Sequence, residues 1–172
     1  KEFYEILFLS ILGVFAGIIG SIYMKGLTFI FKIPKQIPIF FLPIIAGIIC
    51  GIFGIFYPEL LGLGTDTIRS LIESPNYLGY LVILLIGKLF LTVLCIRLNL
   101  FGGIFSPALF LGTCLGSIFA VLLGTFFDVN HSLFAVAGLA AVTSTVIGGP
   151  IATLLIVFEL TSDYNVALGA GI

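Results

Sequence analysis

The chain has 172 residues, and 60% of them belong to the set Ala, Val, Ile, Leu, Met, Phe, Trp, Tyr and Cys, against roughly 45–50% apolar residues in soluble domains. Charged residues make up only 9% and the formal net charge is −1, so there is too little polar surface for a soluble domain and no field that steers nucleic acid to the protein. The composition excludes a soluble enzyme and a nucleic-acid partner, and it predicts an all-α integral membrane protein whose first partner is the lipid bilayer.

Five apolar runs follow one another along the chain and predict its membrane segments. About 20 apolar residues in helical form are enough to cross the hydrocarbon core of a bilayer. In chain order, the runs are Ile6 to Met24, Gln36 to Pro58, Pro75 to Ile96, Leu98 to Phe127, and Val129 to Phe158. A polar loop from Glu59 to Glu73 separates the second run from the third.

The charges between the runs predict an orientation. The stretch Lys25 to Lys35 holds three Lys and no acidic residue, whereas the loop Glu59 to Glu73 holds three acidic residues and one Arg. Basic loops stay on the cytoplasmic side of a membrane. We therefore expect the stretch Lys25 to Lys35 in the cytoplasm and the loop Glu59 to Glu73 outside.

Two of the runs contain helix-breaking residues in the middle of apolar sequence. Gly102 and Gly103 precede Ser106 and Pro107 in the fourth run, and the fifth run is interrupted by Gly-Gly-Pro at 148–150. Broken helices at membrane depth are tolerated only where the backbone is buried in protein or lines a cavity. Paired breaks also indicate a binding site in transporters. The sequence therefore predicts tilted and broken transmembrane helices.

Small residues recur at a spacing of four, which lets helix backbones approach closely. We expect such packing faces within one helix bundle. The pairs are Gly13 and Gly17, Gly47 and Gly51, Gly112 and Gly116, and Ala137 and Ala141.

The break in the fourth run predicts an anion site. Ser106 is a good N-cap, and Pro107 suits the first position of a helix that runs to about Phe126. Such a helix start presents unpaired N–H groups and the positive end of the helix dipole. The predicted anion-binding residues are Gly103, Ile104, Phe105, Ser106 and Pro107. Backbone amides and a hydroxyl without a full positive charge would bind an anion weakly enough for it to leave. An ordinary capped helix start is the alternative.

The remaining polar residues have structural interpretations beside functional ones. Lys88 either reaches a neighbouring carbonyl or the interface, or belongs to an ion pathway. Glu159 either forms a helix-end contact or relays protons. Cys50, Cys95 and Cys114 are interpreted as small buried apolar side chains. One His and no CxxC pair predict no metal site and no cofactor.

Several stretches resemble elements of the CLC chloride channels and chloride/proton exchangers. GGIFSP at 102–107 resembles the GxFxP element of that family. GLGT at 62–65 resembles a glycine-rich turn that precedes a short helix there. LFAVAGLAA at 133–141 resembles the family too, as does GPIAT at 149–153 leading to VFELT at 157–161. Together these elements are specific because they occur in the family's order and at similar spacing.

The resemblance implies an architecture and a ligand. The family core consists of two inverted-topology repeats, and residues 1–172 resemble most of the second one, a partial membrane domain that is incomplete at its C-terminal end. The backbone N–H groups of Ile104 and Phe105 would contact a central chloride. The remainder of the same polypeptide, the first repeat, would supply the other side of the site. The resemblance also implies a homodimer, with Ile151 to Asp163 resembling one helix of its interface, in the cell (inner) membrane.

The predicted function is transmembrane transport of chloride or a similar small anion through a pore whose site is built from helix N-termini. A broken-helix secondary transporter for an organic anion is the alternative. A membrane enzyme is not expected, because the only His, His131, lies beside Asp128 and Asn130 in a loop.

Overall fold

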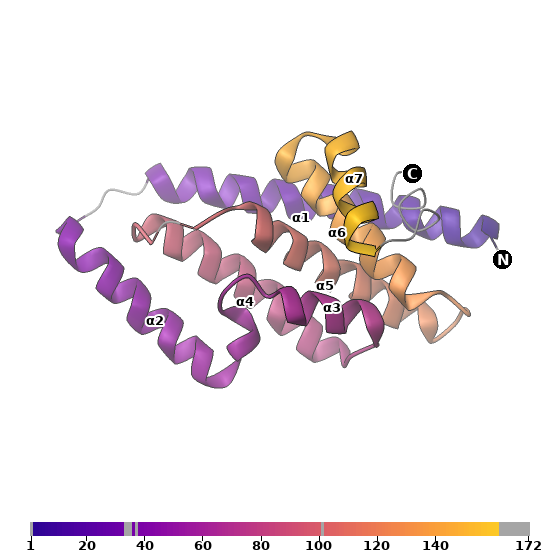
Figure 1. Cartoon of the computed structure of the whole chain (residues 1–172), viewed down its shortest axis with the longest axis horizontal. Coiled ribbons are helices and arrows are strands. Elements are labelled where there is room, and N and C mark those ends of the chain that lie inside the picture. The colour runs from indigo at the N-terminus through magenta and orange to yellow at the C-terminus, as the bar shows by residue number, and fades with distance from the viewer. Residues whose placement is uncertain (1, 33–35, 37, 101, 162–172) are drawn as a thin grey trace.

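The structure is a computed structural model that describes residues 2–32, 36, 38–100 and 102–161. Within these ranges the chain forms α-helices and two short 3-10 helices, and no strand, as the sequence predicts (Figure 1). The elements are α1 (Glu2–Lys32), η1 (Ile39–Phe41), α2 (Leu42–Phe56), η2 (Pro58–Leu60), α3 (Thr65–Glu73), α4 (Leu78–Arg97), α5 (Phe105–Gly124), α6 (His131–Ile147) and α7 (Pro150–Thr161).

Four segments of the described chain are long and apolar enough to cross a membrane. They are Tyr4–Phe29, Ile39–Phe56, Leu78–Arg97 and Phe105–Gly124, while α6 is apolar but shorter. The 26 residues of the first segment extend about 39 Å as a helix, against a hydrocarbon core of about 30 Å. Tilting accommodates such an excess, which agrees with the predicted tilted helices.

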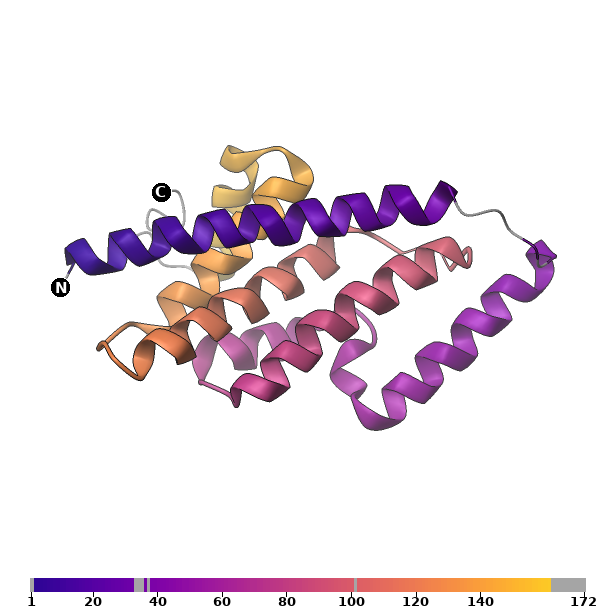
Figure 2. The same ribbon diagram turned by 180° about the vertical axis from the view of Figure 1, so that it is seen from behind.

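The fold is organised around α5, which packs on α6 over most of its length and also on α4 and α3. Figure 2 shows α1 lying across α4, α5 and α6. The centre of the core is fully buried and includes Leu84 of α4, Phe110 of α5 and Phe134 of α6. Helix α2 extends along one edge of the molecule, where it contacts α4 and the two 3-10 helices.

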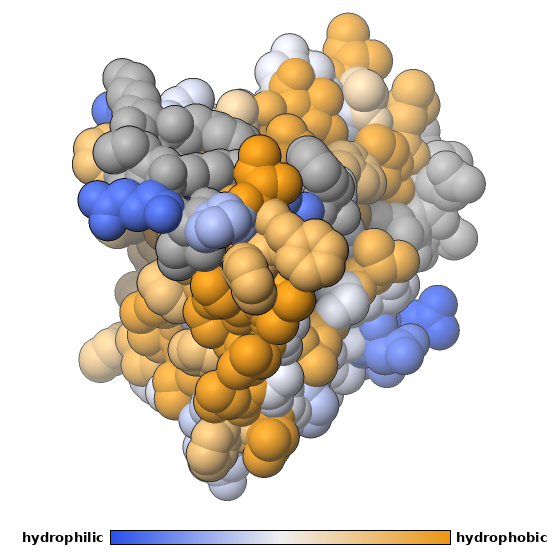
Figure 3. All heavy atoms as spheres, turned by 90° about the vertical axis from the view of Figure 1, so that its left-hand side faces the viewer, coloured by the Kyte–Doolittle hydropathy of each residue, from blue (hydrophilic) through white to orange (hydrophobic). Residues whose placement is uncertain are grey.

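Large apolar side chains cover the outside of the bundle. Figure 3, which looks at the edge where α2 lies, shows a surface made mostly of hydrophobic side chains. On α2 the exposed ones include Ile44, Ile48, Ile52, Ile55 and Phe56. Such a surface is stable against lipid or against further protein rather than in water.

The closest helix contact lies between α5 and α6. A Cβ atom on Gly138 would lie 2.7 Å from the Cα of Gly116, and one on Gly112 would collide with the carbonyl oxygen of Gly138. The predicted close approach at Gly112 and Gly116 is therefore confirmed. For two further pairs the close approach stays a prediction, because an added Cβ would meet no atom of the described residues within 4 Å: Gly13, Gly17, Gly47 and Gly51.

The predicted break in the fifth run is confirmed. Helix α6 ends at Gly148, which has a left-handed backbone (φ 71°), and α7 begins at Pro150. The polar loop from Glu59 to Glu73 is more ordered than its charges suggest, because α3 fills its second half and buries Ile68 and Leu71. The resemblance, in contrast, correctly implies a short helix after the glycine-rich turn.

Candidate anion-binding site

The start of α5 differs from the predicted start by two residues. The helix begins at Phe105, with Ile104 as N-cap and no side-chain capping bond. Ser106 is therefore not the N-cap, and Pro107 is the third helical residue rather than the first. The hydroxyl of Ser106 instead donates to the carbonyl oxygen of Leu63 at 2.8 Å. Pro107 still costs no hydrogen bond, because N–H groups of the first turn have no partner inside the helix.

The backbone at this helix start is open. Ile104 and Phe105 are each more than a third exposed, and a Cβ on Gly102 or Gly103 would meet no described atom within 4 Å. Helix α6 differs, because the side chain of Asn130 accepts a hydrogen bond from its first turn. The uncapped first turn of α5 therefore keeps its N–H groups and the positive end of its dipole available to a ligand.

A turn between α2 and α3 holds the start of α5 in place. Gly62 and Gly64 have left-handed backbones with φ of 61° and 71°, which glycine adopts at no steric cost. The turn brings the carbonyl of Leu63 to Ser106. Gly64 also lies against the ring of Phe110, where a Cβ would come within 2.6 Å of the ring. These glycines therefore set the position of a carbonyl that anchors α5.

Lys88 fastens the same turn to α4. Its side chain is 3% exposed, and Nζ donates to the carbonyl oxygens of Leu60 at 2.9 Å and Gly62 at 2.8 Å. Nζ also lies 5.0 Å from the ring centroid of Phe110. In the part of the chain that the structure describes, carbonyls and an aromatic ring rather than a carboxylate are its partners. The interpretation that Lys88 reaches neighbouring carbonyls is confirmed.

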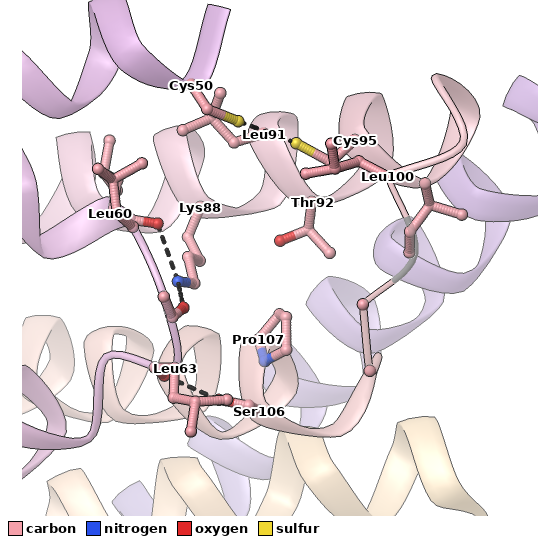
Figure 4. A pocket seen from close by; sticks show the side chains of 15 residues that line it. Cys50, Leu60, Leu63, Lys88, Leu91, Thr92, Cys95, Leu100, Ser106 and Pro107 are labelled. Carbon is pink, nitrogen blue, oxygen red and sulfur yellow. Dashed lines mark hydrogen bonds between the residues drawn. The ribbon is translucent and has the colours of Figure 1, made fainter. Parts of the chain in front are cut away.

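A cavity of about 410 Å³ joins these features (Figure 4). Its walls come from α2, the turn, α4 and the start of α5. Of the five predicted site residues, Gly103, Ser106 and Pro107 line it, whereas Ile104 and Phe105 do not. Lys88 lines the cavity as well. The predicted site of backbone amides and a hydroxyl therefore has a basic side chain in its surroundings, which the sequence analysis did not expect. The hydroxyl of Ser106 already donates to Leu63 and does not offer that proton to an anion.

Tyr23 is a residue of this region that the sequence analysis missed. Its side chain is fully buried, and its hydroxyl donates to the carbonyl oxygen of Ile104 at 3.2 Å. Helix α1 thereby contacts the N-cap of α5. The available signal was the one tyrosine in the uncharged run Ile6 to Met24.

The other polar candidates have structural partners or lie outside the described part. His131 forms a hydrogen bond with the carbonyl of Leu71 at 2.8 Å, and Ser132 donates to Ile72 at 2.8 Å, which joins the start of α6 to α3. Glu159 lies in α7, but its side chain is outside the residues whose surroundings are described. No group of three or more metal-ligating side chains occurs among the residues searched.

Comparison with known proteins identifies the family. The profile described as Voltage gated chloride channel matches residues 2–172. The chain belongs to the voltage-gated chloride channel family. The resemblance inferred from GGIFSP and the later motifs is therefore confirmed, as is the all-α membrane fold.

Several curated relatives of this chloride channel family member carry the name H(+)/Cl(-) exchange transporter ClcA. The protein from Vibrio parahaemolyticus is 35% identical over 169 residues, which is 92% of this chain and 36% of the relative. A Vibrio cholerae protein is 34% identical over 128 residues, 71% of this chain and 27% of the relative. The protein from Citrobacter koseri is 34% identical over 125 residues, 71% of this chain and 26% of the relative. The chain thus spans about a third of these relatives or less.

Proposed function

We propose that the complete protein containing this chain transports chloride or a similar small anion across the cell (inner) membrane. The observation that carries the proposal is the uncapped start of α5, an open helix N-terminus beside a cavity. Family membership and relatives named as H(+)/Cl(-) exchange transporters support it. No observation favours an organic anion over chloride, and the proposed function is transport rather than enzymatic catalysis.

The proposed anion site consists of Gly103, Ile104, Phe105, Ser106 and Pro107. The N–H groups of Ile104 and Phe105 donate to the anion, and the glycine lets the backbone approach it closely. Dipole interactions of this kind contribute about 0.3–1 kcal/mol each when exposed and up to about 2 kcal/mol when partly buried. Neutral donors therefore bind the anion modestly, as conduction requires.

Lys88 contributes to the electrostatics of the cavity beside the proposed site, which it lines together with Gly103, Ser106 and Pro107. Its ammonium group lies in the wall of the cavity and is held there by two carbonyls. It therefore makes the electrostatic potential in the cavity more positive. Because the ammonium group is buried, it does not bind the anion directly and tightly. The electrostatic attraction by Lys88 and the hydrogen bonds from the backbone amides are separate contributions to anion binding. Substitution of Lys88 and replacement of the Phe105 amide distinguish them.

The proposed architecture places residues 1–172 as most of the second inverted repeat of a two-repeat core. The first repeat, on the same polypeptide, completes the other side of the site, and chloride is the transported ligand rather than a cofactor. Two copies form a homodimer that uses the helix from Ile151 to Asp163, part of which lies outside the described residues. The apolar outer face of α2 supports a position against lipid or the first repeat.

The test replaces the Phe105 amide by an ester in the complete protein, which removes one donor and leaves the side chain unchanged. Loss of one hydrogen bond to a charged partner costs about 1.5–3 kcal/mol, which corresponds to a roughly 13- to 160-fold weaker halide affinity by calorimetry. Ser106→Ala is the comparison variant and should bind halide more tightly than the ester variant, because it removes only the bond to Leu63 that holds α5 and leaves both amide donors in place. Unchanged affinity with the ester, together with loss in Ser106→Ala, would overturn the amide mechanism.

A flux experiment separates the two classes of substrate. Proteoliposomes containing the complete protein should exchange chloride and other halides and should take up no labelled organic anion. Organic-anion uptake without halide flux would assign the protein to the other class of transporter. Residues 1–172 alone should give no flux, because the broken helix ends need partners from the rest of the chain.

A further inference from the structure

Two cysteines from different helices meet at the wall of the cavity. Cys50 of α2 and Cys95 of α4 are 45 positions apart in sequence, yet their Sγ atoms lie 3.1 Å apart. Figure 4 shows the two sulfur atoms pointing toward one another. Both are half-buried, whereas Cys114 is buried. The interpretation as small buried apolar side chains therefore fits Cys114 but not this pair.

The pair can be reached from the cavity. Both side chains line the 410 Å³ cavity, so a small reagent in the cavity reaches them. Lys88, Thr92 and Cys95 are spaced i, i+4 and i+7 on α4, share one face of that helix and line the same cavity. Reaction at the pair therefore depends on access from the cavity and on the proximity of the two sulfurs rather than on an activated thiolate.

We propose that Cys50 and Cys95 form a reversible modification site, a dithiol that a hydroperoxide converts into a disulfide. One thiol loses its proton and the thiolate attacks an oxygen of hydrogen peroxide; the O–O bond breaks, a sulfenic acid forms, and the hydroxide that leaves takes up the released proton to give the first water. The second thiol attacks the sulfenic sulfur, the S–S bond forms, and the second water leaves. The two sulfurs together lose two electrons, which the peroxide gains. Because the sulfurs already lie 3.1 Å apart and a disulfide bond is about 2 Å long, the reaction needs little movement.

The cross-link would act on α2, a helix with few buried side chains. On α2 only Leu42 and Ala46 are buried, so a covalent bond to α4 constrains it strongly. Beyond its C-terminal end, α2 continues through η2 into the turn whose carbonyls bind Lys88 and Ser106. A change in the position of α2 on oxidation would therefore reach the start of α5 through this turn. This consequence rests on the proposed anion site, whereas formation of the disulfide does not.

The first experiment tests the disulfide itself. The complete protein in liposomes is treated with hydrogen peroxide, free thiols are alkylated, and peptides are analysed by mass spectrometry. We expect a peptide pair joined through Cys50 and Cys95 that dithiothreitol separates. The pair should persist in Cys114→Ala and disappear in Cys50→Ser and in Cys95→Ser. Equal alkylation of both cysteines before and after peroxide would overturn the proposal, whatever the protein transports.

The second experiment tests the coupling to the site. Chloride flux should fall in proportion to the cross-linked fraction and recover after dithiothreitol, and flux through Cys50→Ser should be insensitive to peroxide. A complete cross-link with unchanged flux would overturn the coupling. An equal loss of flux in Cys50→Ser and the native protein would show that peroxide acts elsewhere.

Discussion

The substitution Lys88→Met tests how the buried ammonium group supports the site. Methionine keeps much of the volume but removes two hydrogen bonds to the carbonyls of Leu60 and Gly62 and the contact with Phe110. Hydrogen bonds of charged groups contribute about 1.5–3 kcal/mol each, and a desolvated cation–π contact contributes about 2 kcal/mol. Removing a lysine from membrane depth recovers about 3 kcal/mol. The net loss of stability is therefore about 3 kcal/mol.

The assay is equilibrium unfolding of the complete protein in mixed micelles, combined with halide calorimetry on the folded fraction. Lys88→Met should lower the free energy of unfolding by about 3 kcal/mol and should also weaken halide binding, because the charge in the cavity wall is gone. Lys88→Arg, which retains charge and donors, should preserve most of both. Native stability in Lys88→Met would refute the role of the two carbonyl bonds, and equal damage in Lys88→Arg would assign the effect to shape rather than charge.

Two further predictions concern contacts within the bundle, and a third concerns its orientation in the membrane. Tyr23→Phe removes the bond to the N-cap carbonyl of α5, so the free energy of unfolding should fall by about 1 kcal/mol and halide binding measured by calorimetry should weaken; native affinity would show that this bond does not position the site. Gly116→Val should lower the free energy of unfolding by more than about 3 kcal/mol and abolish the monodisperse peak in size-exclusion chromatography, because backbone atoms of α6 leave no room for the side chain. The control Gly13→Val, whose added side chain meets no described atom, should preserve that peak. Cysteines introduced at Lys32 and Glu73 should react with impermeant reagents from opposite sides of the membrane, and labelling of both from one side would refute the predicted orientation.

Sequence patterns predicted those features of the fold that depend on residues close together in the sequence. Apolar runs located the membrane helices, and Gly-Gly-Pro located the break between α6 and α7. The start of α5 was placed two residues late, because Ser106 finds its partner 43 positions away at Leu63. Capping rules consider only the local backbone. Tyr23 was missed for the same reason, since its partner Ile104 lies 81 positions away.

The small-residue pairs show a second limit of local patterns. Gly13 and Gly17 have the same spacing as Gly112 and Gly116, yet only the second pair contacts another backbone among the described residues. The spacing shows that one helix face lacks bulky side chains. Which element packs against this face depends on the topology of the whole bundle. Short amphipathic helices present a similar difficulty, and the charges around α3 concealed its two buried apolar residues.

The α5–α6 contact also bears on how the protein is made. The two helices are separated by residues 125–130 alone, and short loops make pairing fast. The pair can assemble as a hairpin once both helices have entered the bilayer, and it then offers the surface on which the earlier helix α1 docks. Substitutions at Gly112, Gly116 or Gly138 therefore act during synthesis and insertion. Their expected phenotype is protein missing from the membrane rather than altered transport by protein that is present.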